Sequence, residues 1–389
     1  MKLAFVVQRY GLEVNGGAEL LCRQIAEHLS KHFTIEIITT CAIDYVTWKN
    51  EYPEGVSSLN NVTVHRFPVD YPRDNQKFNQ FSQRIFQQQH TSDDEIQWMR
   101  LQGPYSTKLL EFIQNNANNF DFFVFFTYLY CTTFFGLPLV KDKAILVPTA
   151  HDEPPIYLSI FKSLFSLPQA LIYSTPEEKK FVNLKFNNEC IPHDIIGTGI
   201  DCPDTIDLSA FKQKYGLENF IVYVGRIDES KGCKELFDFF IRYKMEYPGS
   251  LKLVLLGKPV MKVPKHPDII PLGFVSENDK YNCITASKLL VMPSPFESLS
   301  IVLFEAWQCN RPVLVNGTCD VLKGQCQRSN AGLWYENYLV FKESLNLLLN
   351  NNGLRNTLGM NGFNFIHTNY SWELIEKKYQ KLLKKIIKS

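Results

Sequence analysis

Two glutamates stand eight positions apart in an otherwise apolar segment, residues 293–306 (PSPFESLSIVLFEA). A buried carboxylate without a partner is strongly destabilising, so Glu297 and Glu305 must each reach solvent or a polar group. On an α-helix this spacing is two turns plus about 80°, which puts both carboxylates on one side, about 12 Å apart along the axis. The separation is too long for two carboxylates acting on one bond, and it suits two contacts along an extended ligand. The structural alternative has Glu297 stabilising a helix dipole and Glu305 paired with an arginine.

The loop before this helix has the composition of a phosphate site. Prolines at 293 and 295 bracket a turn, and the helix is expected to begin at Ser298 or Ser300. A serine there would cap the helix and leave its first backbone N–H groups free to bind an anion.

Two cations follow the apolar segment 219–224 in one short loop, which begins at Gly225 and contains Arg226 and Lys231. Two fixed cations suit a diphosphate, and an arginine can bind it through two parallel hydrogen bonds. The alternative is a surface loop in which Arg226 pairs with an acidic neighbour at 228 or 229.

In the first half of the chain, Gly16 and Gly17 precede a helical pattern, and His151 follows the apolar segment 144–150. Paired glycines let a ligand approach the backbone and the free N–H groups of a helix start. The pattern is neither GxGxxG nor a P-loop, which argues against nicotinamide binding and P-loop ATPase chemistry. A plain turn and a structural histidine are the alternatives.

Short apolar segments separated by helical patterns must position these residues. Such segments occupy 2–8, 33–40, 61–69, 122–126, 144–150 and 170–175 in the first half, and 219–226, 251–257, 269–273, 288–294 and 312–317 in the second. Strands alternating with helices predict parallel, doubly wound sheets, which bind ligands outside the carboxyl ends of the strands. We therefore expect an α/β protein of two domains with a cleft between them. Residues 73–103, rich in glutamine and phenylalanine, predict amphipathic helices at the edge of the first domain.

Composition narrows the class of protein. The 389 residues carry a net charge of +1, so no overall field attracts nucleic acid. No apolar run is long enough to span a membrane, and no signal peptide is recognisable. The ten cysteines form no CxxC pair and indicate free thiols in a reducing compartment, with a disulfide between Cys319 and Cys326 as a minor alternative.

Residues 371–389 predict an amphipathic helix with six lysines and two glutamates. This helix either packs on a domain or contacts a membrane surface.

These motifs together, in this order, resemble the retaining GT-B glycosyltransferases of glycosyltransferase family 4. The resemblance rests on NGGAE (15–19), AHD (150–152), GTGID (197–201), VGRIDESKG (224–232), the run GFVSENDKYNCITASKLLVMPS (273–294) and the EX7E motif from Glu297 to Glu305. It covers essentially the whole chain, and the last three motifs are the most specific.

The resemblance implies two Rossmann-like domains facing across a cleft. Residues 1–200 would form the acceptor-side domain, residues 205–368 would bind the nucleotide sugar, and the helix 371–389 would pack back on the first domain. Roles for individual residues follow from the same resemblance. Arg226 and Lys231 would hold the diphosphate, Glu297 the donor sugar and Glu305 the ribose hydroxyls. The backbone near Leu299 and Ser300 would lie by the phosphates, Phe274 and Val275 by the base, Gly16 and Gly17 by the phosphates from the other domain, and His151 near the transferred sugar.

The implied activity is transfer of a sugar, with retention, to a hydroxyl of a glycan or lipid-linked acceptor in cell-envelope or exported polysaccharide synthesis. The enzyme would act in the cytoplasm or peripherally at the inner face of the membrane, with no cofactor, no metal and no nucleic acid. A 2-epimerase of nucleotide sugars on the same scaffold and a non-catalytic nucleotide-sugar-binding protein are the alternatives. Phe78 and Phe81, in the 73–103 segment, are expected to contribute to the acceptor site.

Overall fold

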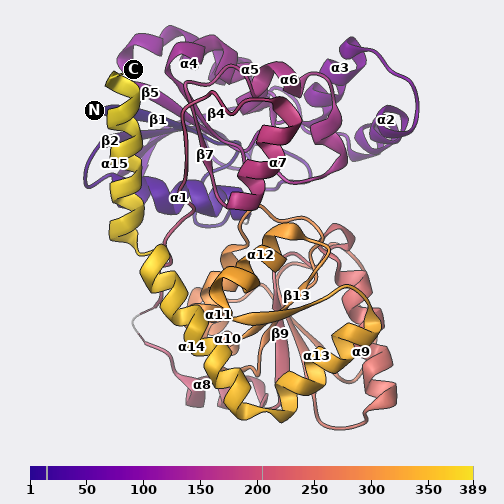
Figure 1. Ribbon diagram of the computed structural model, residues 1–389. Helices are drawn as coiled ribbons and strands as arrows, with labels where there is room; N and C mark the ends of the chain where they lie inside the picture. The colour runs from indigo at the N-terminus through magenta and orange to yellow at the C-terminus, as the bar shows by residue number, and fades with distance from the viewer. Residues whose placement is uncertain (15, 204, 389) are drawn as a thin grey trace. The chain divides into compact units, whose positions relative to one another are not determined.

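The computed structural model describes residues 1–14, 16–203 and 205–388. Its chain divides into two compact units, Met1–Thr198 with Trp372–Ser389 (unit 1) and Gly199–Ser371 (unit 2), and the second is therefore inserted into the first. Each unit has a predominantly parallel sheet with helices packed against it (Figure 1). The predicted α/β architecture is confirmed. Among the described helices, none is long and apolar enough to cross a membrane.

Unit 1 has an eight-stranded sheet in the order β3-β4-β2-β1-β5-β6-β7-β8. Its strands are β1 (Lys2–Val6), β2 (Thr34–Thr40), β3 (Gly55–Leu59), β4 (Val62–Phe67), β5 (Phe122–Phe126), β6 (Ala144–Val147), β7 (Ala170–Tyr173) and β8 (His193–Ile195). Only β3, at one edge, runs antiparallel to its neighbour among the described strands. Its helices are α1 (Gly17–Leu29), α2 (Asn75–Gln87), α3 (Ser92–Gln102), α4 (Thr107–Asn115), α5 (Cys131–Gly136), α6 (Phe161–Leu164), α7 (Pro176–Phe186) and α15 (Trp372–Lys388).

The order of the strands in unit 1 defines where a ligand is expected. From β1 the chain goes first to β2 and β4 on one side and then to β5, β6 and β7 on the other. The β1–β5 boundary is therefore a topological switch point, where doubly wound sheets bind ligands. β1 and β5 are buried along almost their whole length because helices cover both faces of the sheet.

Unit 2 has a six-stranded sheet in the order β11-β10-β9-β12-β13-β14, and its switch point lies between β9 and β12. The strands are β9 (Phe220–Val224), β10 (Lys252–Leu256), β11 (Ile269–Gly273), β12 (Leu290–Met292), β13 (Val313–Asn316) and β14 (Gly332–Tyr335). The helices are α8 (Leu208–Tyr215), α9 (Cys233–Glu246), α10 (Glu277–Ala286), α11 (Ile301–Gln308), α12 (Asp320–Ser329), α13 (Tyr338–Asn350) and α14 (Asn352–Asn369).

The C-terminal helix α15 returns to unit 1, where it contacts α1 and β8 (yellow in Figure 1). Its apolar face is buried there; the buried residues are Ile375, Tyr379, Leu382, Leu383 and Ile386. The ring of Trp372 stacks on that of His28 with centroids 3.6 Å apart, and Glu376 lies 2.8 Å from His32 Nε2. The face that could insert into a membrane is thus occupied by protein.

Candidate active site

The loop that follows β9 carries both predicted cations. It begins at Gly225, whose φ of 147° favours glycine, and the Tyr223 hydroxyl donates to the Arg226 carbonyl over 2.7 Å. Arg226 Nε lies 3.1 Å from Asp228 Oδ2, so the guanidinium has an ion pair within its own loop, as the structural alternative expected. Asp228 also caps the short turn 229–231 by accepting from the backbone N–H of Ser230.

Close backbone packing joins this loop to the one that follows β12. Gly232 has φ 73°, and a Cβ placed there would lie 2.2 Å from the carbonyl oxygen of Pro293. The same carbonyl accepts a hydrogen bond from Asn316 Nδ2 over 3.1 Å. Only glycine fits this contact, and it brings Lys231 Nζ to 2.8 Å from Glu297 Oε1. A cation and a carboxylate from two loops therefore meet at the switch point of unit 2.

The helix that follows Glu297 begins at the later of the two predicted serines, with Ser300 as its N-cap residue. α11 starts at Ile301, so Glu297 lies outside the helix and the two-turn geometry expected for Glu297 and Glu305 is wrong. Ser300 occupies the cap position with φ 64°, but its side chain makes no capping hydrogen bond, so the predicted serine cap is also wrong. The Ser300 hydroxyl is buried and has no hydrogen-bond partner among the described residues. This polar atom and the first N–H groups of α11 remain available to an anion.

Glu305 lies in the interior of unit 2 and pairs with a lysine rather than with the arginine that the structural alternative proposed. Its Oε1 accepts from Lys280 Nζ over 2.8 Å, and Lys280 also contacts Glu277 Oε2 over 2.7 Å. Burial raises the pKa of Glu305 and the charge of Lys280 opposes that rise. Glu305 Oε2 is buried with no partner among the described residues. One oxygen is thus fixed by the protein while the other is left to accept a hydrogen bond.

The remaining predicted donor contacts in unit 2 lie at carboxyl ends of strands. Phe274, 67% exposed, and Val275 follow β11 and lead into α10, the helix that carries Lys280. Leu299 is buried, which leaves its backbone as the part that a ligand could reach. β11 lies at the edge of the sheet, with β10 between it and β9.

In unit 1, Gly16 and Gly17 form the start of α1 after the loop that follows β1. Asn15, the first residue of the predicted motif, lies outside the described residues. A buried Glu19 organises this loop: it accepts from Gln8 Nε2 over 2.8 Å and from Arg9 Nε over 2.9 Å. A Cβ on Gly16 would lie 2.0 Å from Glu19 Oε2, whereas one on Gly17 would meet no atom within 4 Å.

His151 follows β6, at the same carboxyl edge of the unit 1 sheet as the β1–α1 loop, because β1, β5 and β6 are parallel. Its Nδ1 lies 3.3 Å from Glu153 Oε1. The loop is held by the buried Glu178, which accepts from the backbone N–H groups of Ala150 and Ser174 over 2.6 Å each. Burial raises the pKa of Glu178 to about 8.

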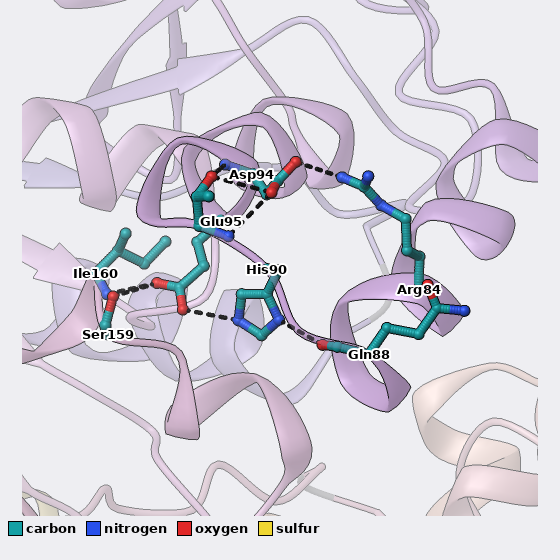
Figure 2. Close-up of polar contacts among 8 residues, drawn as sticks. Arg84, Gln88, His90, Asp94, Glu95, Ser159 and Ile160 are labelled. Atoms are coloured by element: carbon teal, nitrogen blue, oxygen red, sulfur yellow. Dashed lines mark hydrogen bonds and ion pairs between the residues drawn. The ribbon is translucent and has the colours of Figure 1, made fainter.

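The 73–103 segment forms α2 and α3, as predicted, and two of its three phenylalanines, Phe78 and Phe81, are partly buried, whereas Phe86 is 39% exposed. Phe78 and Phe81 pack against the core of unit 1, and the Phe78 ring lies 5.9 Å from that of Trp98. Their replacement by alanine would therefore remove core contacts, which makes these residues poor probes of an acceptor site. The helices are tied to the loop after β6 by Glu95, which accepts from Ser159 Oγ and from Ile160 N over 2.7 and 2.9 Å (Figure 2).

The sequence analysis missed three residues that hold the candidate site residues or their loops in place. Lys280, Asn316 and Glu178 act on residues far away in the sequence, and no local pattern marks Lys280 or Glu178. A weak signal existed for Asn316, because it is a polar residue at the carboxyl end of the apolar strand β13. All ten cysteines are free, so Cys319 and Cys326 form no disulfide.

Comparison with known proteins defines the class. Residues 205–365 match the family model described as Glycosyl transferases group 1. An uncharacterized glycosyltransferase of Methanocaldococcus jannaschii is 22% identical over 97% of this chain and 96% of its own length. The capsular polysaccharide biosynthesis glycosyltransferase CapM of Staphylococcus aureus is 26% identical over 46% of this chain and 51% of its own. The crystal structure of Anabaena HepE in complex with UDP and glucose matches with a TM-score of 0.72 at 13% identity, over 99% of this chain and 100% of that one.

The fold is therefore GT-B, as predicted. Within that fold class, the match over unit 2 and the relatives named as glycosyltransferases identify the chain as a glycosyltransferase.

Proposed function

We propose that this glycosyltransferase moves a sugar, with retention, from a nucleotide-diphosphate sugar to a hydroxyl group of an acceptor. The observation that carries the proposal is the meeting of Lys231 and Glu297 beside the start of α11, where the buried Ser300 hydroxyl has no partner among the described residues. A cation, free helix N–H groups and a carboxylate form a site for a phosphate bonded to a sugar.

The chemistry assigns a task to each of these groups. The bond between the anomeric carbon and the diphosphate oxygen breaks, and the diphosphate leaves with the electron pair. The acceptor oxygen bonds to the same carbon from the same face, and its proton passes to the leaving phosphate oxygen. Arg226, Lys231 and the start of α11 stabilise the negative charge as it develops on the diphosphate. These cations take the place of a metal in the proposal, so chelation by EDTA is expected to leave the rate unchanged.

The other assignments follow from the resemblance and from position in each unit. Glu297 contacts the donor sugar, and Glu305 accepts from the ribose hydroxyls through its unpartnered Oε2. The backbone at Gly225, Leu299 and Ser300 lies by the phosphates. Phe274 and Val275 lie by the base, Gly16 and Gly17 approach the phosphates, and His151 contacts the transferred sugar.

The pathway and location are proposed on separate grounds. A role in cell-envelope or exported polysaccharide synthesis, with a glycan or lipid-linked acceptor, is supported by the likeness to CapM. The free cysteines support a reducing, cytoplasmic compartment. Because the apolar face of α15 is covered, any contact of this helix with a membrane would be electrostatic, through its lysines.

Thermal stabilisation by a panel of nucleotide sugars tests donor binding, because a ligand raises the apparent stability of the state that binds it. UDP-glucose is the first candidate, since UDP and glucose occupy the structurally similar HepE. Failure of every nucleotide sugar to stabilise the protein would contradict the proposal, and release of an epimerised nucleotide sugar from donor alone would favour the epimerase.

Replacement of Lys231 by alanine or of Glu297 by glutamine should lower kcat by about 10²–10³, the usual loss when one group that stabilises a transition state is removed. Steady-state transfer assays measure the effect. Lys234→Ala is the matched control, because Lys234 is nearby, its side chain is 66% exposed, and it contacts only Glu229 at 3.8 Å among the ion pairs of the described residues. Full transfer by both site variants would show that the assignment is wrong.

A further inference from the structure

Unit 1 contains a cavity that none of the predicted site residues lines. Its volume is about 270 Å³, and its walls come from three segments: Gly11–Glu13 after β1, Tyr52–Leu59 before and along β3, and Arg66 on β4. Arg66 lies near the carboxyl end of β4, and β4, β2 and β1 are parallel. The cavity therefore opens at the carboxyl edge of the sheet, beside the loop that also carries Gly16.

Specific contacts build one wall of this cavity. The Tyr52 hydroxyl donates to the Glu13 carboxylate, and this hydrogen bond lowers the pKa of Glu13, which keeps it charged. The Tyr52 ring lies against Gly11, where a Cβ would stand 2.0 Å from the tyrosine oxygen. The Tyr52 ring also contacts Arg66, whose guanidinium carbon lies 4.3 Å from the ring centroid.

Arg66 is the unusual group in this cavity. It is only 8% exposed, its Nη1 donates to Ser57 Oγ over 2.5 Å, and its Nη2 donates to the Tyr10 carbonyl over 3.0 Å. Its Nε has no hydrogen-bond partner, and no carboxylate lies within ion-pair distance of its guanidinium, among the described residues. In the part of the chain that the structure describes, only neutral groups accept the hydrogen bonds of this buried cation, and its charge also lowers the pKa of Glu13 across the cavity. A buried cation without a direct ion pair is costly for stability, which favours a binding role for Arg66.

The charged and apolar side chains that line the cavity indicate which kind of ligand it could bind. Two carboxylates, Glu13 and Glu54, line the cavity with one guanidinium, and Glu54 is paired with Lys108, whose Nζ lies 2.8 Å from Glu54 Oε1. The charges around the cavity are therefore balanced, which favours a neutral ligand over an ion. Hydroxyl groups suit this mixture, because they donate to carboxylates and accept from arginine. Leu12 and Val56, 56% and 68% exposed, add apolar surface for C–H groups. The volume is below that of pockets for drug-sized ligands, as expected for a single sugar ring.

We propose that this cavity binds a neutral sugar residue of the acceptor. The proposal rests on the proposed function, because it assigns the sugar to the acceptor glycan. The cavity shares the β1–α1 loop with Gly16, so a saccharide bound there lies on the acceptor-side unit at the edge where the reaction is expected. Arg66 and Glu13 would choose among hydroxyl configurations, and Val56 would contact one face of the ring.

Ligand-observed NMR with the full-length protein tests this assignment. The probes are methyl α- and β-glycosides of glucose, galactose and mannose, with methyl glucuronide as the anionic comparison. At least one neutral hexoside should bind with a Kd of about 1 mM. The Val56→Trp variant, whose new side chain fills the cavity from an exposed position, should bind that hexoside about tenfold or more weakly. Leu184→Trp is the control, because Leu184 is also 68% exposed in unit 1 and does not line the cavity.

The outcomes separate this proposal from the proposed function. Absence of hexoside binding, unchanged binding by Val56→Trp, or preference for the glucuronide would each overturn it. Arg66→Met is a second variant that should also lose hexoside binding. If Arg66→Met does not fold, Val56→Trp still tests the proposal. Thermal stabilisation by the nucleotide sugar should persist in Val56→Trp. Failure of the wild-type protein to bind any nucleotide sugar would instead contradict the proposed donor site.

Discussion

The ion pair between Lys280 and Glu305 sets the charge of the more deeply buried of the two motif glutamates. Burial alone raises the pKa of Glu305, and the ammonium group of Lys280 opposes it. Glu305 can accept hydrogen bonds with both oxygens only while it is ionised. Lys280 is therefore a positioning residue: it orients one oxygen of Glu305 and favours the ionised state that the proposed contact with a ribose hydroxyl would require.

Lys280→Met should raise the donor KM more than it lowers kcat. The loss of a hydrogen bond to a charged group is worth about 1.5–3 kcal/mol, which is roughly a ten- to hundredfold change in KM. Without the lysine the pKa of Glu305 rises further, so the donor KM should increase as the pH falls towards 6. Donor KM measured across pH checks this, with Lys280→Arg expected to restore the flat profile.

The control for that experiment is Glu277→Gln, because Glu277 is the other partner of Lys280 and its side chain is 71% exposed. Its removal should leave the donor KM almost unchanged. An equal loss in Glu277→Gln and Lys280→Met would mean that Lys280 matters only for the packing of α10.

Gly232→Ala should destabilise unit 2 by about 1–3 kcal/mol, because alanine is strained at φ 73° and its Cβ would clash with the Pro293 carbonyl. Denaturant unfolding measures the loss. Gly249→Ala is the control, since a Cβ there meets no atom within 4 Å and its φ lies outside the glycine-favouring range. Equal stability of the two variants would contradict the close approach of the two loops.

Single residues were predictable where a local pattern carried the information. Glu297, Arg226 and Lys231 could be singled out because each lies in a loop that follows an apolar strand. Lys280 could not, because its contact with Glu305 depends on α10 packing against α11 across 25 residues of sequence. The exact start of α11 was also unpredictable, because both Ser298 and Ser300 are good capping residues, and the left-handed backbone of Ser300 is set by the surrounding loops.

At the scale of elements, α2 and α3 form a helical hairpin whose connection depends on His90 and Thr91. Thr91 and Asp94 form a capping box at the start of α3, and His90 Nε2 lies 3.0 Å from Glu95 Oε1 (Figure 2). His90 Nδ1 lies 3.0 Å from the Gln88 carbonyl. The contact with this carbonyl and that with Glu95 raise the pKa of His90, and the hydrogen bonds from Ser159 and Ile160 outweigh burial and lower the pKa of Glu95.

The stability that His90 contributes should therefore depend on pH. The raised pKa of His90 gives stability that is complete below about pH 6.5 and is lost as the pH rises through the folded value. The lowered pKa of Glu95 gives stability that is present above about pH 4.3 and is lost as the pH falls. His90→Asn should thus cost most at about pH 5–6, by less than about 1 kcal/mol, and least near pH 9.

Chemical denaturation of both proteins at a series of pH values checks this dependence. Arg84→Gln is the matched control, because it removes the neighbouring ion pair with Asp94, whose groups both stay charged over this range. A His90→Asn effect that stayed constant from pH 5 to 9 would rule out the ion pair as its source.

The elements themselves were predictable to the extent that they are buried on both faces. β1, β5, β9 and β13 are continuous apolar runs and were recognised. β3, GVSSL, was missed because it is an exposed edge strand with almost no buried residue, so its sequence lacks the apolar signal. β8, with three half-buried residues, and β14, with a glycine at its start, were missed for similar reasons.

At the scale of the whole molecule, unit 1 is completed by the last helix of the chain. Each of the five buried side chains of α15 contributes about 1.5–3 kcal/mol by burial. Their sum is comparable with the about 5–15 kcal/mol by which a typical domain is stable. Truncation after Ser371 should therefore unfold unit 1 and leave the transition of unit 2 in place.

Calorimetry of the truncated protein, with limited proteolysis to identify the fragment that resists, checks this expectation. Replacement of both Lys384 and Lys385 by alanine is the control, because these residues lie on the exposed face of the same helix. A truncated protein that kept two unchanged transitions would show that α15 is dispensable.

The return of α15 to unit 1 also fixes an order of events during synthesis. The ribosome completes Gly199–Ser371 before it reaches Trp372, and domains generally fold as units while the chain is made. Unit 2 can thus reach its final structure while unit 1, although translated first, still lacks a helix. Every nascent chain passes through a stage in which the surface of α1 and β8 that receives α15 is uncovered, and a chain that stops there is a natural substrate for chaperones and proteases.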